Sequence, residues 1–108
     1  MRSADVTRAL GALAQEHRLE AYRKLVQAGA DGLAAGALAQ ALGVPNSSLS
    51  FHLTQLAHAG LIVQQRVGRS LIYRADYAAM NGLVSYLLEN CCGGETCLAN
   101  GRAVAMCG

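Results

Sequence analysis

The chain has 108 residues, a formal net charge of +2 and a hydrophobic fraction of 53 %. This length corresponds to one domain, and a monomer of this size gains from the additional apolar area that a dimer buries. Aromatic residues are few, and the abundance of Ala and Leu favours helices. The weak positive net charge neither proves nor excludes a nucleic-acid partner. Whether the chain binds nucleic acid has to be judged from the placement of its arginines.

No segment has the character of a targeting or membrane-spanning element. The first residues carry charges every few positions, which is not typical of a signal peptide. No apolar run approaches the length of about 20 residues that a membrane-spanning helix needs. We therefore expect a cytoplasmic protein with no membrane partner, in a compartment where thiols stay reduced. The sequence also lacks a phosphate-cradling loop or an acid–base pair, so we do not expect an enzyme.

Helical spacing of apolar residues recurs along the chain. The segments that show it are residues 4–14, 16–28, 34–42, 46–59 and 76–90. Gly43 is a normal residue just past a helix C-terminus, and Pro45 suits a first helical turn because its missing N–H is not needed there. Asp76 is a candidate N-cap for the last helix.

Residues 61–75 (LIVQQRVGRSLIYRA) predict a two-stranded hairpin that turns at Gly68. The apolar positions that fit half-buried strands are Val63, Val67, Leu71 and Tyr73. The basic residues on or near the hairpin are Arg66, Arg69 and Arg74. The predicted fold class is therefore mainly α with a small β-hairpin, in the order of a winged helix-turn-helix protein.

The helix predicted at 46–59 has the side chains that major-groove recognition needs, because they are short or able to bond base edges and phosphates. These candidate DNA-binding residues are Ser47, Ser48, Ser50, His52 and Gln55. Arg66, Arg69 and Arg74 would contact phosphates or a minor groove beside that helix. A serine-rich face alone is more often a solvated surface, so the prediction depends on helix, turn and hairpin occurring together.

The segment GLAAGALAQALGVPNSSLSFHLTQLAHAGLIVQQRVGRSLIYRADYAAM resembles the ArsR/SmtB family of winged-helix metalloregulators. The polar helix start, the His-Leu pair, the AGL ending and the GR-x-x-x-Y wing occur in family order, and the resemblance runs from about residue 8 to residue 92. It implies a homodimeric repressor of double-stranded operator DNA, with the first and last helices at the dimer interface. Phe51 and Pro45 depart from the family pattern, which leaves the operator sequence open.

All four cysteines follow the last predicted helix. They are Cys91, Cys92, Cys97 and Cys107. A disulfide framework would staple distant segments, whereas this cluster is typical of a local ligand set. We therefore expect a winged-helix DNA-binding and dimerisation domain over residues 1–90 and a flexible Cys-rich ligand-binding tail over residues 91–108.

Metal sites of this family occur in different parts of one scaffold. The arsenic site of the third helix is missing, because Ala34 and Gly36 stand where thiols would be. The zinc site of the last helix is missing too, because Asp76 and Glu89 have no histidine with them. What remains, NCCGGETC, resembles a subset of arsenic-responsive members.

That resemblance implies that Cys91, Cys92 and Cys97 bind trivalent arsenic as the inducer, whether arsenite, methylarsenite or antimonite, and that the repressor then leaves its operator. Cys107 is an additional candidate ligand. Soft thiolates select soft ions, and Gly93 and Gly94 let the backbone fold back sharply between the cysteines.

Two other uses of the cysteines stay open. Zinc or cadmium could be the sensed ion, although zinc wants four ligands, commonly in Cys-x-x-Cys pairs, and the spacing CC-x4-C-x9-C does not give such pairs. A thiol redox switch would need Cys91 or Cys92 to pair with Cys97 or Cys107, because adjacent cysteines form only a strained ring. The cysteines could also be idle.

Overall fold

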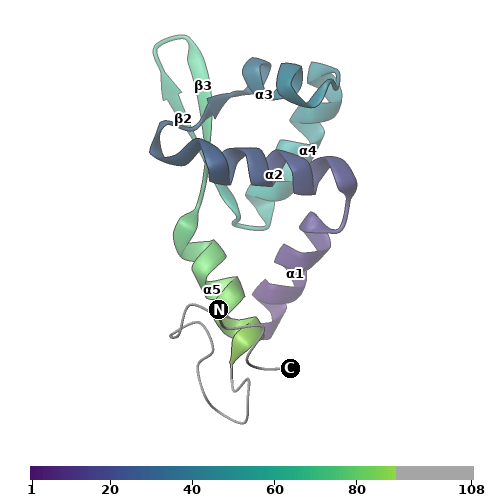
Figure 1. Cartoon of the computed structure of the whole chain (residues 1–108), viewed down its shortest axis with the longest axis vertical. Coiled ribbons are helices and arrows are strands. Elements are labelled where there is room, and N and C mark those ends of the chain that lie inside the picture. Colours follow the sequence, from purple (N-terminus) through teal and green to yellow (C-terminus); the bar gives the residue numbers. More distant parts are fainter. Residues whose placement is uncertain (90–108) are drawn as a thin grey trace.

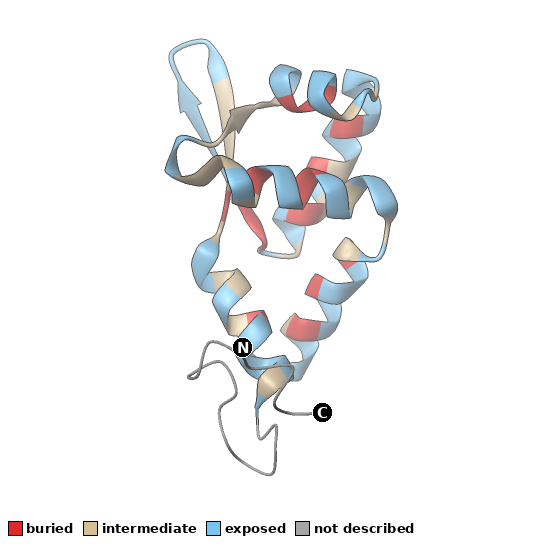
Figure 2. Cartoon of the chain, viewed as in Figure 1, coloured by how far each residue is buried: buried red, intermediate tan, exposed pale blue. Residues whose placement is uncertain are grey.

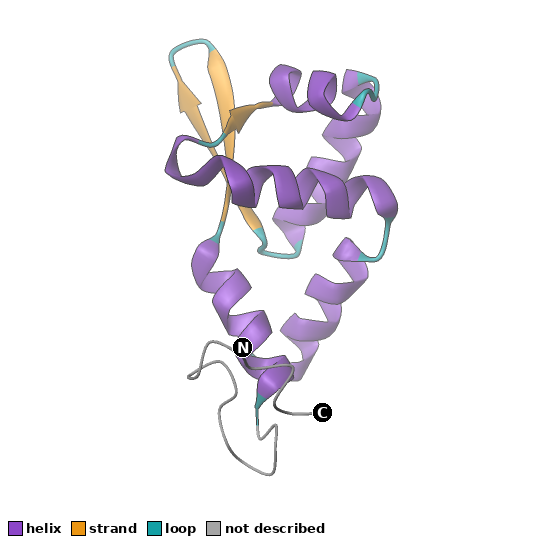
Figure 3. Ribbon diagram, viewed as in Figure 1, coloured by secondary structure: helices purple, strands orange, loops and turns teal. Residues whose placement is uncertain are grey.

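The computed structural model describes residues 1–89, which form five α-helices and a small antiparallel sheet (Figures 1 and 3). The helices are α1 (Ser3–Leu13), α2 (Glu16–Ala28), α3 (Ala35–Leu42), α4 (Asn46–His58) and α5 (Tyr77–Leu88). The strands are β1 (Leu33–Ala34), β2 (Ile62–Val67) and β3 (Ser70–Ala75), and a 3-10 turn, η1 (Gly29–Asp31), precedes β1. The predicted winged helix-turn-helix fold is confirmed.

Helix boundaries follow from local capping. The side chain of Asp76 accepts a hydrogen bond from the backbone N–H of Ala79 over 3.2 Å, so Asp76 is the N-cap of α5 as predicted. Gly43 ends α3 in the left-handed conformation at φ 67°. The N–H groups of Gly43 and Val44 bond to the carbonyls of Gln40 and Ala39, which gives α3 a Schellman end.

The sheet has three strands in the order β1-β3-β2, one more than the predicted hairpin. Leu33 pairs with Tyr73 and Ala34 with Ile72, so the short β1 covers the outer edge of β3. Gly32 makes this approach possible, because its φ is +65° and a Cβ atom there would lie 2.4 Å from the carbonyl oxygen of Tyr73. A strand of two residues carries no alternating pattern, so the sequence could not reveal it.

The β2–β3 hairpin turns at Gly68, as predicted, with Val67 opposite Ser70. The prediction that its apolar residues are half buried holds for Leu71 and Tyr73 but is wrong for β2, where Val63 is 47 % and Val67 52 % exposed. Val67 lies next to the turn, in the part of the hairpin that projects away from the helices (Figure 1), whereas Val63 lines an open groove beside α4.

The core lies where α2 crosses α3, α4 and the base of the hairpin (Figure 2). Its largest fully buried side chains are Leu25, Leu38, Leu49, Leu53, Leu56 and Leu61. Leucines dominate because the chain has so few aromatic residues, and each fully buried leucine stabilises the fold by about 1.5–3 kcal/mol.

Helices α1 and α5 converge at the opposite end of the molecule from the hairpin (Figure 1). Small side chains, Ala9 and Ala12, are buried along α1, while Leu10 is 41 % exposed. On α5 Leu83 is buried, but Leu87 is 56 % exposed. Within residues 1–89, no helix is both long enough and apolar enough to cross a membrane.

Candidate nucleic-acid interface

Helix α4 has one buried and one exposed face. Leu49, Leu53 and Leu56 are buried in the core. Three of the predicted DNA-binding residues lie on the exposed part of the first two turns, namely Ser47, Ser48 and Ser50. Their short side chains let the helix backbone approach a DNA groove.

The turn before α4 sets the direction of that helix. Pro45 is its N-cap, at φ −63° and ψ 149°, and so lies one position before the helical turn in which we expected it. The carbonyl of Pro45 accepts the first hydrogen bond of the helix, from the N–H of Leu49 over 3.0 Å. The backbone N–H groups in the first turn of a helix have no intrahelical partner. Because no side chain caps α4, these groups are available to phosphate oxygens.

His52 and Gln55, also predicted to bind DNA, lie further along α4 and are half buried. Nδ1 of His52 accepts a hydrogen bond from Nε of Arg18, at the start of α2, over 3.4 Å. The rings of His52 and His17 are 5.7 Å apart between centroids. Partial burial, followed by the charges of Arg18 and His17, lowers the pKa of His52 below its usual value.

Phe51 is the most exposed large apolar side chain of α4, with 56 % of its surface exposed. The guanidinium carbon of Arg18 lies 5.7 Å from the centre of its ring, which is a cation–π distance. Arg18 therefore contacts two neighbouring residues of the DNA-reading helix. Sequence reasoning missed Arg18, because it is one of several basic residues in its helix and lies 34 positions from His52.

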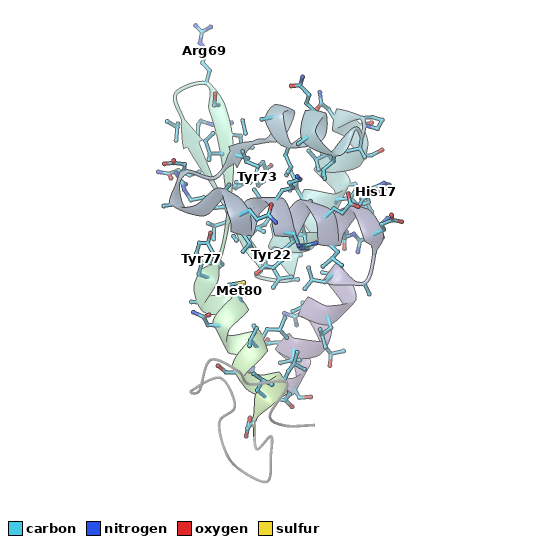
Figure 4. All side chains as sticks on the ribbon, in the orientation of Figure 1. His17, Tyr22, Arg69, Tyr73, Tyr77 and Met80 are labelled. Carbon is cyan, nitrogen blue, oxygen red and sulfur yellow. The ribbon has the colours of Figure 1, made fainter. Side chains whose placement is uncertain are left out.

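The three arginines of the hairpin differ in their surroundings. Arg66 and Arg69 are exposed, and Figure 4 shows Arg69 extending from the tip of the hairpin. Arg74 instead donates a hydrogen bond from Nε to the carbonyl of Ala30 over 2.6 Å and another from Nη1 to Oε1 of Gln65. Arg66 and Arg69 therefore extend into solvent, and their predicted phosphate contacts stay predictions, while Arg74 joins β3 to η1 and to β2. Its predicted DNA contact stays a prediction.

An open groove separates α4 from β2. Thr54, Ala57 and His58 line it from the helix, and Val63 and Gln64 line it from the strand. Thr54 is exposed, and its hydroxyl donates to the carbonyl of Ser50 over 2.9 Å. The groove therefore lies beside the C-terminal half of α4 and the first residues of β2.

The predicted ligand cysteines lie outside the described residues. These are Cys91, Cys92, Cys97 and Cys107, and the predicted tail over residues 91–108 lies there as well. Within residues 1–89, the structure brings together no group of three or more His, Cys, Asp or Glu side chains that could hold a metal ion. Asp76, one of the acidic residues considered for a zinc site, caps α5 instead.

Together, the helix-turn-helix of α3 and α4 and the adjoining hairpin define a winged helix-turn-helix DNA-binding domain. A family model described as a helix-turn-helix domain matches residues 13–65. No curated protein matches the sequence.

Solved structures of similar proteins support a more specific assignment. An ArsR-like transcriptional regulator from Rhodococcus sp. RHA1 has a TM-score of 0.69 and 33 % identity, over 78 % of this chain and 76 % of that chain. The homodimeric winged helix-turn-helix DNA-binding domain of a possible ArsR-family regulator from Mycobacterium bovis has a TM-score of 0.64 and 30 % identity, over 81 % of each chain. A possible transcriptional regulator for arsenical resistance has a TM-score of 0.65 and 26 % identity, over 73 % of this chain and 79 % of that chain.

The chain belongs to the ArsR family of DNA-binding transcription regulators. The matched proteins named above are described as transcriptional regulators or possible transcriptional regulators.

Proposed function

We propose that this ArsR-family protein is a homodimeric repressor that senses trivalent arsenic through C-terminal cysteine thiolates and then leaves its operator DNA. One observation carries the proposal: the cysteine cluster follows directly after α5, and α5 is the helix whose apolar face is left uncovered in the monomer. A ligand bound there is in a position to alter how two protomers meet.

The DNA-binding part of the proposal depends on α4 and the hairpin. Ser47, Ser48 and Ser50 would face base edges or phosphates, and Arg66 and Arg69 would contact the backbone beside them. A dimer that holds its two copies of α4 about 34 Å apart would read two half-sites separated by one helical turn of DNA. Homodimerisation is supported by the assembly described for the M. bovis domain.

The dimer would use α1 and α5. Leu10, Val84 and Leu87 leave 41 %, 38 % and 56 % of their surfaces exposed on these two adjacent helices. A second copy of the chain would cover them and supply the apolar burial that a domain of this size lacks alone.

The sensing part depends on the chemistry of the donor set. Trivalent arsenic bound to three sulfurs forms a pyramid with a lone pair at its apex, and it needs no fourth ligand. Cys91, Cys92 and Cys97 offer three thiolates within a short stretch of sequence, with Cys107 as a further candidate. The similar structure described as a possible regulator for arsenical resistance adds support. The three thiols must lose their protons to act as ligands, so binding is coupled to proton release.

The thiolates would act on DNA through the dimer. When Cys91, Cys92 and Cys97 hold a ligand at the end of α5, that helix takes up a different position against its partner, and the two copies of α4 change their spacing or tilt. A ligand shifts this equilibrium only by its differential affinity for the two arrangements. A coupling of about 1–3 kcal/mol weakens DNA binding about 5- to 150-fold.

The test is a fluorescence anisotropy titration of the full chain on DNA from immediately upstream of its own gene, under reducing conditions. Arsenite, methylarsenite and zinc are then added in turn to the complex. We expect the arsenicals to release the DNA and zinc to leave it bound. Equal DNA affinities with and without saturating arsenite and methylarsenite would contradict the proposal that the protein senses arsenic.

Two further outcomes point to the alternatives. Release by zinc or cadmium alone would make the protein a Zn/Cd-sensing repressor of the same fold. Release by a mild thiol oxidant, reversed by a reductant, would make it a redox sensor that uses the same cysteines. Retention of the DNA under all of these conditions would leave the cysteines without a sensory role.

A further inference from the structure

Arg18 joins the start of α2 to the middle of the DNA-reading helix. Its Nε atom lies 3.4 Å from Nδ1 of His52, and the two residues are 34 positions apart in the sequence. The contact is partly buried, and Gln15 holds the start of α2 by accepting a hydrogen bond from the backbone N–H of Arg18 over 2.9 Å. Arg18 is therefore attached to both helices at a defined place.

The direction of this hydrogen bond fixes the protonation of His52. A guanidinium group can only donate hydrogen bonds, so Nδ1 of His52 must supply the lone pair. A histidine that accepts at Nδ1 is neutral and carries its one N–H proton on Nε2. The nearby side chains favour the same neutral state, because Arg18 and His17 both face the ring from α2 and no carboxylate is among the groups that shift its pKa.

Aromatic contacts hold the arrangement in place. The guanidinium of Arg18 also lies over Phe51, with its central carbon 5.7 Å from the centre of the ring. Phe51 and His52 meet edge to face at 5.9 Å, and His17 lies 5.7 Å from His52 on the other helix. The imidazole ring therefore has a neighbour on α2 as well as on α4, which restricts its rotation.

His52 also shares a side of α4 with other polar residues. Ser48 lies one turn before it and Gln55 one turn after it along the helix, a spacing that places side chains next to each other. Ser48 is exposed, and Gln55 and His52 are half buried. A donor at Nε2 of His52 thus belongs to a row of hydrogen-bonding groups on the surface that we propose to contact DNA.

We propose that Arg18 is a positioning residue of the DNA interface, which holds His52 as an Nε2–H donor for an acceptor atom of the operator, either a purine N7 or a phosphate oxygen. The proposal rests on the proposed operator binding. It adds a residue outside the helix-turn-helix to DNA recognition, and it assigns His52 a single chemical role, that of a hydrogen-bond donor.

The main test is a double-mutant cycle on DNA affinity with Arg18→Met, which removes every side-chain donor, His52→Ala and the double variant. Because Arg18 acts through His52, each single change should weaken operator binding by about five- to tenfold, which corresponds to the loss of about one hydrogen bond. The double variant should be no weaker than the single variants. Arg23→Met removes the same charge from an exposed position of α2 and serves as the matched control.

Additive losses in the cycle would overturn the proposal, since Arg18 would then contact DNA by itself. A loss of thermal stability in Arg18→Met without any loss of operator affinity would overturn it as well. Arg18→Lys gives a second variant with the charge retained, in case Arg18→Met does not fold. Its ammonium group can still donate to Nδ1 of His52, so the proposal requires Arg18→Lys to keep His52 protonated on Nε2 and to lose less operator affinity than His52→Ala.

Non-specific DNA distinguishes the two acceptors. If His52 donates to a purine N7, His52→Ala weakens operator binding and leaves non-specific binding unchanged. If it donates to a phosphate, both affinities fall by the same factor. Either result supports the shared donor chemistry. No loss on either DNA overturns it.

A nitrogen-15 NMR spectrum of the histidine rings provides a readout that a merely structural role of Arg18 would not change. The wild-type protein should show His52 protonated on Nε2 alone near neutral pH, and Arg18→Met should shift His52 towards a mixture of forms. An Nδ1-protonated His52 in the wild type would overturn the proposal. Failure of the wild type to bind any DNA would instead overturn the proposed function, so the two failures can be told apart.

Discussion

The two ends of the molecule bury their apolar side chains to very different degrees (Figure 2). At the end that contains α3, α4 and the hairpin, Leu25, Leu38 and Leu53 each leave 1 % or less of their surface exposed. At the other end, α1 buries mainly alanines, and α5 leaves Leu87 56 % exposed. The first end holds a complete core, whereas the second has an apolar surface suited to a second copy of the chain.

The largest effect should come from the complete core. Leu56 is fully buried in α4, so Leu56→Ala should lower the free energy of unfolding by about 2–5 kcal/mol through lost contacts and a cavity. Chemical denaturation measures this loss. Leu19→Ala is the matched control, because Leu19 is 44 % exposed on α2, and its loss should be less than about 1 kcal/mol. Similar losses of stability for the two variants would mean that the core between α2, α3 and α4 is not packed as described.

The proposed sensing function can be tested through the cysteines that follow α5 in the sequence. Cys97→Ser should leave DNA affinity unchanged without ligand but abolish release by arsenite, a loss of the whole expected 5- to 150-fold response, or about 1–3 kcal/mol. Methylarsenite has only two sites left for sulfur, so Cys91 and Cys92 should still respond to it. Anisotropy titrations measure both responses. If Cys97→Ser keeps the full arsenite response, the control variant Cys107→Ser should lose it, and Cys107 becomes the third ligand.

The incomplete core predicts a specific effect on self-association. Leu87→Glu would bury a charge at the proposed dimer interface and should raise the dimer dissociation constant at least tenfold, or about 1.4 kcal/mol. Sedimentation equilibrium measures this constant. Val67→Glu introduces the same charge on the hairpin, at a residue that is 52 % exposed. This control should leave the dimer dissociation constant unchanged. Equal dissociation constants for Leu87→Glu and the wild type would place the interface elsewhere.

A smaller effect is expected at the junction between the two ends. Asp76 accepts a hydrogen bond from the N–H of Ala79 at the start of α5, so Asp76→Ala should destabilise the protein by about 0.5–2 kcal/mol. Asp76→Asn keeps a capping oxygen, so it should lose only a small part of this stability. Thermal unfolding followed by circular dichroism compares the two variants. An equal loss for both would show that the negative charge matters, rather than the cap.

The smallest effect concerns pH. The pKa of His52 is lowered in the folded state by partial burial, then by the charge of Arg18, then by His17, so the unfolded chain binds a proton at a higher pH than the folded one does. The contribution of His52 to stability is therefore present above the ordinary histidine pKa of about 6.5 and is lost as pH falls below it.

Denaturation at about pH 8 and about pH 5.5 tests this prediction. The wild type should lose more stability between the two values than His52→Gln, which has no imidazole to titrate. His58→Gln, at an exposed position near the end of the same helix, is the control and should follow the wild type. A pH dependence that His52→Gln leaves unchanged would contradict the assignment.

Local patterns predicted most of the fold. The helix expected at 16–28 is observed as Glu16–Ala28, and the turns at Gly43 and Gly68 lie where they were expected. Helical periodicity and glycine-dependent turns are properties of neighbouring residues, so a single sequence carries them. Contacts between distant residues were not predictable in this way. The pairing of Arg18 with His52, the engagement of Arg74 with Ala30 and the exposure of β2 all depend on how elements pack.

The third strand has a consequence for how the protein behaves at high concentration. A two-stranded hairpin offers two rows of unpaired backbone groups, and each row can recruit a strand from another molecule. Because β1 pairs with Ile72 and Tyr73 on the outer side of β3, the middle of that row is covered, whereas the outer row of β2 stays open. The charge of Arg66 lies near the turn end of β2 and opposes the pairing of two like strands. Gly32, which allows β1 to approach β3, therefore also reduces the exposed strand edge through which this small domain could aggregate.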